Sequence, residues 1–222
     1  MALESSLKNL VLVLGGVGLV SALALGGFSE LTKKPIELAN QQKIIASLKQ
    51  VLPAFDNDPS QALDTVPVDG GQLLVYRAMQ GDSLVGKAVQ SFSPNGFGGN
   101  ISVMVGFDAQ GVITGYSVLE HAETPGLGSH MVDWFKPQGA PTVSLIERLF
   151  GFRMPVKARH SSVYGLNPGE QELQVSKDGG TIDAITAATI SSRAFLDAIN
   201  RASKGFALDA QISAGAASQA TK

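Results

Sequence analysis

Two stretches of the sequence combine residue types that suit close contact with a ligand. The first is Glu120–Gly128, which ends in Glu123-Thr124-Pro125-Gly126-Leu127-Gly128. Proline fixes one backbone angle and glycine permits unusual ones, so the main chain of this segment can approach a flat ligand closely. An ordinary glycine turn has the same composition, and the residues alone favour that simpler interpretation.

The second stretch is Asp183–Ser192, where several hydroxyl side chains lead into an apolar, helix-forming segment. Hydroxyl side chains in this position are typical N-caps. The same geometry also forms an anion site, because free amides and the positive end of the helix dipole point at the ligand. Capping alone explains the pattern, so from the residues both interpretations stay open.

Other kinds of chemistry lack support in the sequence. It contains no G-x-S-x-G elbow, P-loop or H-E-x-x-H motif. His121, Glu123 and His130 flank a Pro-Gly turn without the usual ligand spacing, so we expect neither a metal site nor a catalytic group. Without cysteine, the chain alone cannot hold an iron–sulfur cluster. Its net charge of −2 argues against nucleic acid as a partner, because phosphate binding needs a basic surface.

A long uncharged segment precedes both stretches. Asn9–Ser29 comprises 21 residues without a charge, and at about 1.5 Å per residue such a helix spans the roughly 30 Å hydrocarbon core of a bilayer. A cleaved signal peptide is the alternative, but its apolar region usually has only about 7–15 residues. We therefore predict a transmembrane anchor over residues 1–30. The flanking charges do not set its orientation.

The remaining residues are predicted to form one α+β protein. Residues 31–71 are expected to be a helical stalk, with Pro35 in the first turn and Pro53 at the end, followed by a polar linker. Residues 72–208 are expected to form the main domain, and residues 209–222 a disordered tail. Within the domain, the patterns predict strands over 73–79, 83–92, 101–105 and 112–119, a loop over 95–100, and helices over 143–150 and 190–206.

Together, the two stretches resemble the hallmarks of a known family. Asp183-x-x-Thr186-x-Ala188-Thr189-x-Ser191 is similar to the D-x-x-[ST]-G-A-T-x-[ST] motif of FMN-binding domains that carry flavin covalently. The segment 123–128 is similar to their second motif. With its apolar N-terminal segment and short soluble part, nearly the whole chain resembles the G subunits of Rnf ferredoxin:NAD oxidoreductase complexes. The C subunits of sodium-pumping NADH:quinone oxidoreductases are close relatives, but usually have a longer soluble part.

The resemblance implies a cofactor and its attachment site. In this family the threonine that matches Thr189 is joined through a phosphoester bond to FMN by a separate flavin transferase, which takes the FMN from FAD. Asp183, Thr186 and Ala188 would belong to the sequence that the transferase reads. The other implied cofactor contacts are Glu123, Thr124, Gly126, Leu127, Gly128 and Lys177.

Two further residues bear on the cofactor. Trp134, the only tryptophan, is a candidate either for stacking on the flavin or for the core. Ala187 stands where the family usually has glycine, and its methyl group restricts the backbone. We therefore expect attachment at Thr189, with Ala187 as a possible cause of slower attachment.

The predicted function is that of a membrane-anchored flavoprotein subunit, which carries electrons within an ion-translocating redox complex of the Rnf type. The resemblance implies partner membrane and iron–sulfur subunits, a domain on the extracytoplasmic side of the cytoplasmic membrane, and no independent catalytic activity. One alternative is the equivalent C subunit of the quinone-reducing complex. Another is a non-redox scaffold that has lost its flavin through the change at Ala187.

Overall fold

The computed structural model describes residues 6–59, 63–137 and 162–220 of the chain. The chain divides into two compact units, Met1–Ile44 and Ile45–Lys222. The helix expected over residues 143–150 lies outside the described residues. The α+β class expected from the sequence is confirmed, because a long apolar helix precedes a unit that combines an antiparallel sheet with helices.

Nearly all described residues of the N-terminal unit belong to one helix, which continues into the second unit. Helix α1, Leu7–Val51, is long and apolar enough to cross a membrane, and none of its most apolar window is buried in the protein. Pro35 lies inside this helix, so the expectation that it opens a separate stalk helix is wrong. Good helix formers such as leucine, lysine and glutamate flank the proline on both sides, and the helix continues through the one missing hydrogen bond.

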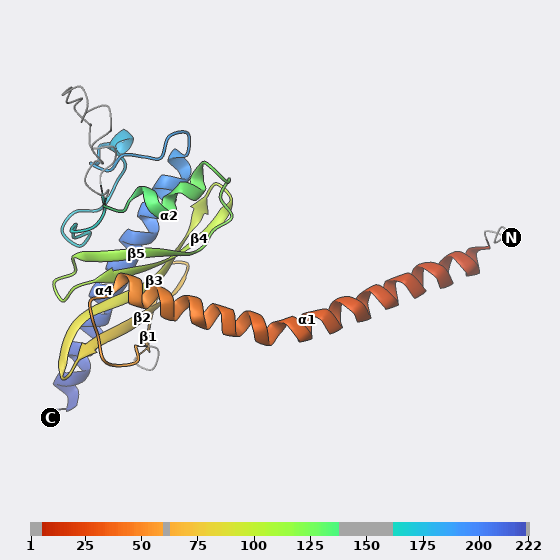
Figure 1. The fold of residues 1–222 in the computed structure, drawn as a ribbon, viewed down its shortest axis with the longest axis horizontal. Coiled ribbons are helices and arrows are strands. Elements are labelled where there is room, and N and C mark those ends of the chain that lie inside the picture. The colour runs from red at the N-terminus through yellow and green to blue at the C-terminus, as the bar shows by residue number, and fades with distance from the viewer. Residues whose placement is uncertain (1–5, 60–62, 138–161, 221–222) are drawn as a thin grey trace, which may run out of the picture. The chain divides into compact units, whose positions relative to one another are not determined.

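The second unit contains a five-stranded antiparallel sheet in which each strand pairs with the next one in the chain (Figure 1). Its strands are β1 (Leu63–Val68), β2 (Gly71–Gln80), β3 (Ser83–Gly96), β4 (Gly99–Phe107) and β5 (Ile113–Glu120). The sequence predicted a linker where β1 lies. Only one β1 residue, Val66, is buried, so the strand lacks the regular apolar alternation by which strands are recognised.

Both faces of the sheet are covered. Helix α4, Thr189–Ala220, crosses one face and packs against β1 to β4 (Figure 1). On this face, the Ser91 hydroxyl donates a hydrogen bond to the Ala198 carbonyl at 2.8 Å. The last turn of α1 covers part of the sheet as well: Leu48 and Val51 are buried, and the Thr114 hydroxyl donates to the Val51 carbonyl at 2.6 Å.

Short helical segments close one end of the sheet. These are η1 (Gly128–His130), α2 (Met131–Trp134) and η2 (Ser176–Asp178). The buried Tyr116 hydroxyl donates to the Met131 carbonyl at 2.8 Å and so fixes α2 against β5. The Phe135 ring stacks on Phe195 of α4 with 4.6 Å between ring centroids. The core therefore continues from the sheet into the segment that follows β5.

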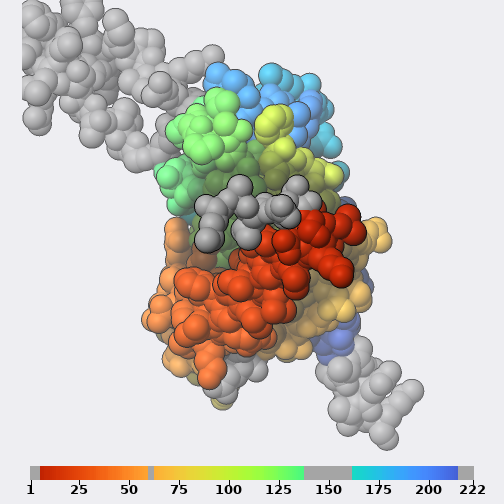
Figure 2. All heavy atoms as spheres, turned by 90° about the vertical axis from the view of Figure 1, so that its right-hand side faces the viewer, coloured from red at the N-terminus to blue at the C-terminus, as the bar shows by residue number. Residues whose placement is uncertain are grey.

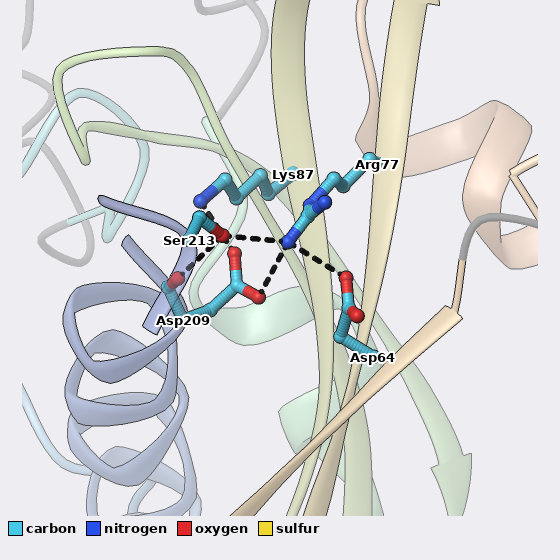
Figure 3. Close-up of polar contacts among 5 residues, drawn as sticks. All are labelled: Asp64, Arg77, Lys87, Asp209 and Ser213. Carbon is cyan, nitrogen blue, oxygen red and sulfur yellow. Dashed lines mark hydrogen bonds and ion pairs between the residues drawn. The ribbon is translucent and has the colours of Figure 1, made fainter. Parts of the chain in front are cut away.

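A charge cluster built around the buried pair Lys87–Asp209 fixes the distal part of α4 to β2 and β3 (Figure 3). Asp209 accepts from Lys87 at 2.5 Å and from Arg77 at 3.0 Å, and Arg77 also contacts Asp64 at 2.7 Å and the Ser213 hydroxyl at 2.8 Å. The prediction of disorder from residue 209 onward is wrong for this helix, which continues to Ala220. The alanine- and serine-rich composition of this segment is typical of disorder, and it does not indicate that the Asp209 carboxylate anchors the helix.

The same contacts shift the ionisation of Asp209. Burial alone raises the pKa of this carboxyl group, but hydrogen bonds from Lys87 and Arg77 outweigh burial and hold the pKa below its usual range. The folded state therefore gains stability from Asp209 above the ordinary aspartate pKa of about 3.9, and loses it as the pH falls through the lowered value.

Replacing Asp209 with asparagine should lower the free energy of unfolding by about 3 kcal/mol, because the buried Lys87 ammonium loses its counterion. Thermal unfolding of the detergent-solubilised chain, followed by Trp134 fluorescence, measures the change. Asp82→Asn, in the exposed turn between β2 and β3, is the matched control and should unfold like the unchanged chain. Equal transitions for the two variants would show that the cluster adds no stability.

Candidate functional site

A pocket of about 330 Å³ forms where three segments far apart in the sequence meet. These are the tip of the β3–β4 hairpin, the segment after β5, and the start of α4, which gather at one end of the sheet (Figure 2). The lining residues are Phe97, Glu123, Thr124, Leu127, Gly128, Ala187, Ala188, Thr189, Ile190 and Ser191. The two stretches singled out in the sequence thus form one site.

Most of the residues predicted for the site line this pocket, but Gly126, Asp183, Thr186 and Lys177 do not. Gly126 lies in the turn beside it, where its amide donates to the Ser129 hydroxyl at 2.9 Å. Asp183 and Thr186 are exposed, and Asp183 makes a long contact of 3.5 Å with the Ser176 hydroxyl. Exposure of these last two residues is compatible with the recognition role that the resemblance implies for them.

Glu123 holds the three segments together. Its side chain is 5% exposed, and its two carboxylate oxygens accept hydrogen bonds from different elements. One accepts from the Gly98 amide at 3.0 Å, and the other from the Ser191 hydroxyl at 2.5 Å. Gly128 packs against this pair, because a Cβ atom there would lie 2.5 Å from both the Glu123 carboxylate and the Ser191 oxygen. The carboxylate therefore builds the pocket wall.

The histidine on the same segment also has a local role. His121 accepts a hydrogen bond at Nδ1 from the Glu123 amide at 3.2 Å. Among the described residues, no three histidine or carboxylate side chains lie together as potential metal ligands.

The acceptor candidate Thr189 opens helix α4. The first amides of a helix have no partner within it, and the positive end of the helix dipole lies beside them. The role of Ser192 was not predicted from the sequence. This fully buried residue closes the loop that precedes Thr189. Its hydroxyl accepts from the Ile185 amide at 2.9 Å and donates to the Ala188 carbonyl at 3.0 Å. The Ser192 hydroxyl thus fixes the loop, and Thr189 lines the pocket.

A cation lies directly at the Thr189 hydroxyl. Lys177 in η2 donates from Nζ to Thr189 Oγ1 at 3.1 Å. The neighbouring residue Asp178 forms a two-pronged ion pair with Arg193 of α4, with contacts of 2.7 and 2.6 Å. The hydrogen bond from Arg193 lowers the pKa of the Asp178 carboxyl. This ion pair ties η2 to the first turns of α4 and so places Lys177 beside Thr189.

Trp134 does not line the pocket. Its Nε1 donates to the Asp183 carbonyl at 3.0 Å, and its ring packs, partly buried, against the core. Of the two roles considered for this residue, the structure supports packing and support of the loop that precedes α4.

Ala187 adopts a left-handed conformation with φ of 59°, and it is the only non-glycine residue with positive φ among those described. For residues with a side chain this conformation costs roughly 1–2 kcal/mol, because Cβ approaches the following carbonyl oxygen. The structure therefore gives a physical reason for glycine at this position of the motif: the chain turns here to deliver Thr189 to the helix start.

Ala187→Gly should raise the free energy of unfolding by about 1 kcal/mol, because glycine adopts positive φ without the Cβ clash. Thermal unfolding again measures the difference. Ala109→Gly, in the exposed β4–β5 turn and without positive φ, is the matched control and should instead lose about 0.5 kcal/mol through added freedom of the unfolded chain. A lower transition temperature for Ala187→Gly would contradict the strain.

Comparison with known proteins agrees with the geometry. The model of the FMN-binding domain family matches residues 96–204, which include all three segments of the pocket. Three relatives are named as the G subunit of an ion-translocating oxidoreductase complex. The protein from Cereibacter sphaeroides is 35% identical over 86% of this chain and 80% of its own length. That from Cronobacter sakazakii is 36% identical over 78% and 76%, and that from Escherichia coli is 33% identical over 85% and 82%.

The sequence motifs, the pocket that joins them and these relatives lead to one assignment. The chain contains an FMN-binding domain and belongs to the family of G subunits of ion-translocating oxidoreductase complexes.

Proposed function

We propose that this protein is the flavin-carrying subunit of an ion-translocating redox complex, with FMN attached through its phosphate to Thr189. The observation that carries the proposal is the pocket that Thr189 lines together with four residues of the 123–128 segment, with Lys177 hydrogen-bonded to the Thr189 hydroxyl. The relatives named above support membership in such a complex.

The residues around Thr189 suit a phosphodiester better than a free hydroxyl. The Lys177 ammonium and the first amides of α4 offset negative charge at this point. A threonine hydroxyl is a weak nucleophile, and among the described residues no histidine or carboxylate hydrogen-bonds to Thr189 Oγ1. We therefore infer that a separate flavin transferase supplies the activation. The hydroxyl loses its proton, the new phosphoester bond forms, and the pyrophosphate bond of FAD breaks to release AMP.

Bound FMN supplies the electron-transfer chemistry, and the protein supplies binding and orientation. Since the chain contains no cysteine, any iron–sulfur centres that exchange electrons with it belong to partner subunits. We propose membrane subunits and iron–sulfur subunits as those partners, and no independent catalytic activity for this chain. Helix α1 serves as the membrane anchor, since it is the one helix among the described residues that is long and apolar enough to cross a membrane.

Thr189→Ala should abolish covalent flavin while leaving the fold intact, because a partly exposed hydroxyl at a helix start contributes only about 0.5–2 kcal/mol. The full chain is coexpressed with the flavin transferase, denatured, and examined for flavin fluorescence on its gel band. Thr65→Ala, an exposed threonine on β1, is the matched control and should stay fluorescent.

Two outcomes would contradict the proposal. A dark band for the unchanged chain would favour the non-redox scaffold, and a fluorescent band for Thr189→Ala would move the attachment to another residue. The subunits that copurify separate the ferredoxin-linked complex from the quinone-reducing one.

We also propose that the flavin domain lies outside the cytoplasm, as the resemblance implies. Alkaline phosphatase is active only where its disulfides form, so a fusion after Lys222 should be active in intact cells. The same reporter fused after Lys8, ahead of the apolar segment, is the control and should be inactive. The opposite pattern of activities would place the domain in the cytoplasm.

A further inference from the structure

We propose that Phe97 stacks on the isoalloxazine ring of the FMN held at Thr189 and forms one wall of the ring site. This inference rests on the proposed function and adds a residue that neither sequence motif contains. Phe97 is 68% exposed and occupies the two-residue turn between β3 and β4. Among the described residues of the second unit, it is the one exposed aromatic side chain.

The hairpin tip that carries Phe97 is held in place from two sides. On one side, the Gly98 amide donates to the buried Glu123 carboxylate at 3.0 Å. A Cβ atom at Gly98 would lie within 2 Å of the Ala122 carbonyl oxygen, so the backbone is packed directly against the segment after β5. On the other side, the Ser93 hydroxyl donates to Asp197 of α4 at 2.6 Å. Because the turn is held in place while the Phe97 ring stays exposed, the ring is positioned to contact a ligand.

The pocket lining combines polar and apolar side chains, and Phe97 is one of the apolar ones. Thr189 lines the pocket and accepts from Lys177, so a phosphate group would lie beside this ammonium. Phe97, Leu127 and Ile190 line the same pocket and are 68%, 41% and 50% exposed. FMN has the same two-part character, a charged phosphate joined by a ribityl chain to a flat aromatic ring. A flat ring between an aromatic side chain and aliphatic side chains gains both apolar burial and stacking.

The structure favours Phe97 over the tryptophan as the stacking residue. Trp134 is committed to the Asp183 carbonyl through its Nε1 and packs against the core, whereas Phe97 lines the pocket and packs against no core cluster. Because most of its surface is exposed, changing Phe97 should not affect the folding of the chain.

The test places a tryptophan at the proposed contact in the flavin-loaded full chain. An indole ring in contact with an excited flavin quenches its fluorescence by electron transfer, and this quenching requires contact. Phe97→Trp should therefore lower native flavin fluorescence several-fold, and denaturation should restore it. Leu84→Trp, also on an exposed apolar position but at the opposite end of β3, is the matched control and should not change the fluorescence.

A second pair of variants measures solvent access. In Phe97→Ala, iodide should quench the native flavin more strongly, with a Stern–Volmer constant raised about two-fold or more, because the stacked ring no longer shields it. Leu84→Ala should match the unchanged chain. Equal native fluorescence in the two tryptophan variants, together with equal iodide quenching in the two alanine variants, would overturn the stacking role. A chain without flavin on the denaturing gel would instead overturn the proposed function.

Discussion

The site depends on one buried carboxylate. Glu123 lies in the segment after β5, and its two oxygens accept from the β3–β4 hairpin and from the first turn of α4. Three stretches separated by many residues are thereby held around a single cavity. A buried carboxylate is costly unless both of its oxygens are satisfied. Here a backbone amide and a hydroxyl meet that need, and no cation among the described residues forms an ion pair with Glu123. The positive charge of the site remains available at Lys177, close to Thr189.

This separation of charged and apolar groups matches FMN, which joins a charged phosphate to an aromatic ring. The pocket offers aliphatic and aromatic surface and the start of α4, and the Lys177 ammonium lies at the hydroxyl of its lining residue Thr189. The covalent bond proposed at Thr189 would remove most of the entropy cost of holding FMN, so the remaining contacts need only orient the ring. The modest size of the cavity agrees with a ligand that remains partly accessible to an electron-transfer partner.

The parts of the site that could be predicted from the sequence are those whose residues lie close together along the chain. The acceptor motif and the 123–128 segment each carry their own pattern, and the hairpin from β4 to β5 follows from the alternation of Ile101, Val103 and Val105 ahead of a turn. What escaped prediction depends on contacts between distant residues. Phe97 lies in a segment that the sequence indicated only as a loop, and Ser192 resembles any serine in a first helical turn. Asp209 gains its importance from Lys87, which lies on a strand 122 residues away.

The position of Asp209 has a consequence for the size of the folding unit. The region that matches the FMN-binding family ends at residue 204, yet the carboxylate that neutralises the buried Lys87 lies beyond it. On the N-terminal side, β1, β2 and most of β3 also precede the matched region. The part of the chain that recognises the cofactor is thus smaller than the part that must fold around it. A soluble version that begins at residue 96 would expose the edge of β4, and one that ends at residue 204 would leave the Lys87 ammonium without Asp209. One that keeps the last turn of α1 and continues past Ser213 would retain the intact unit.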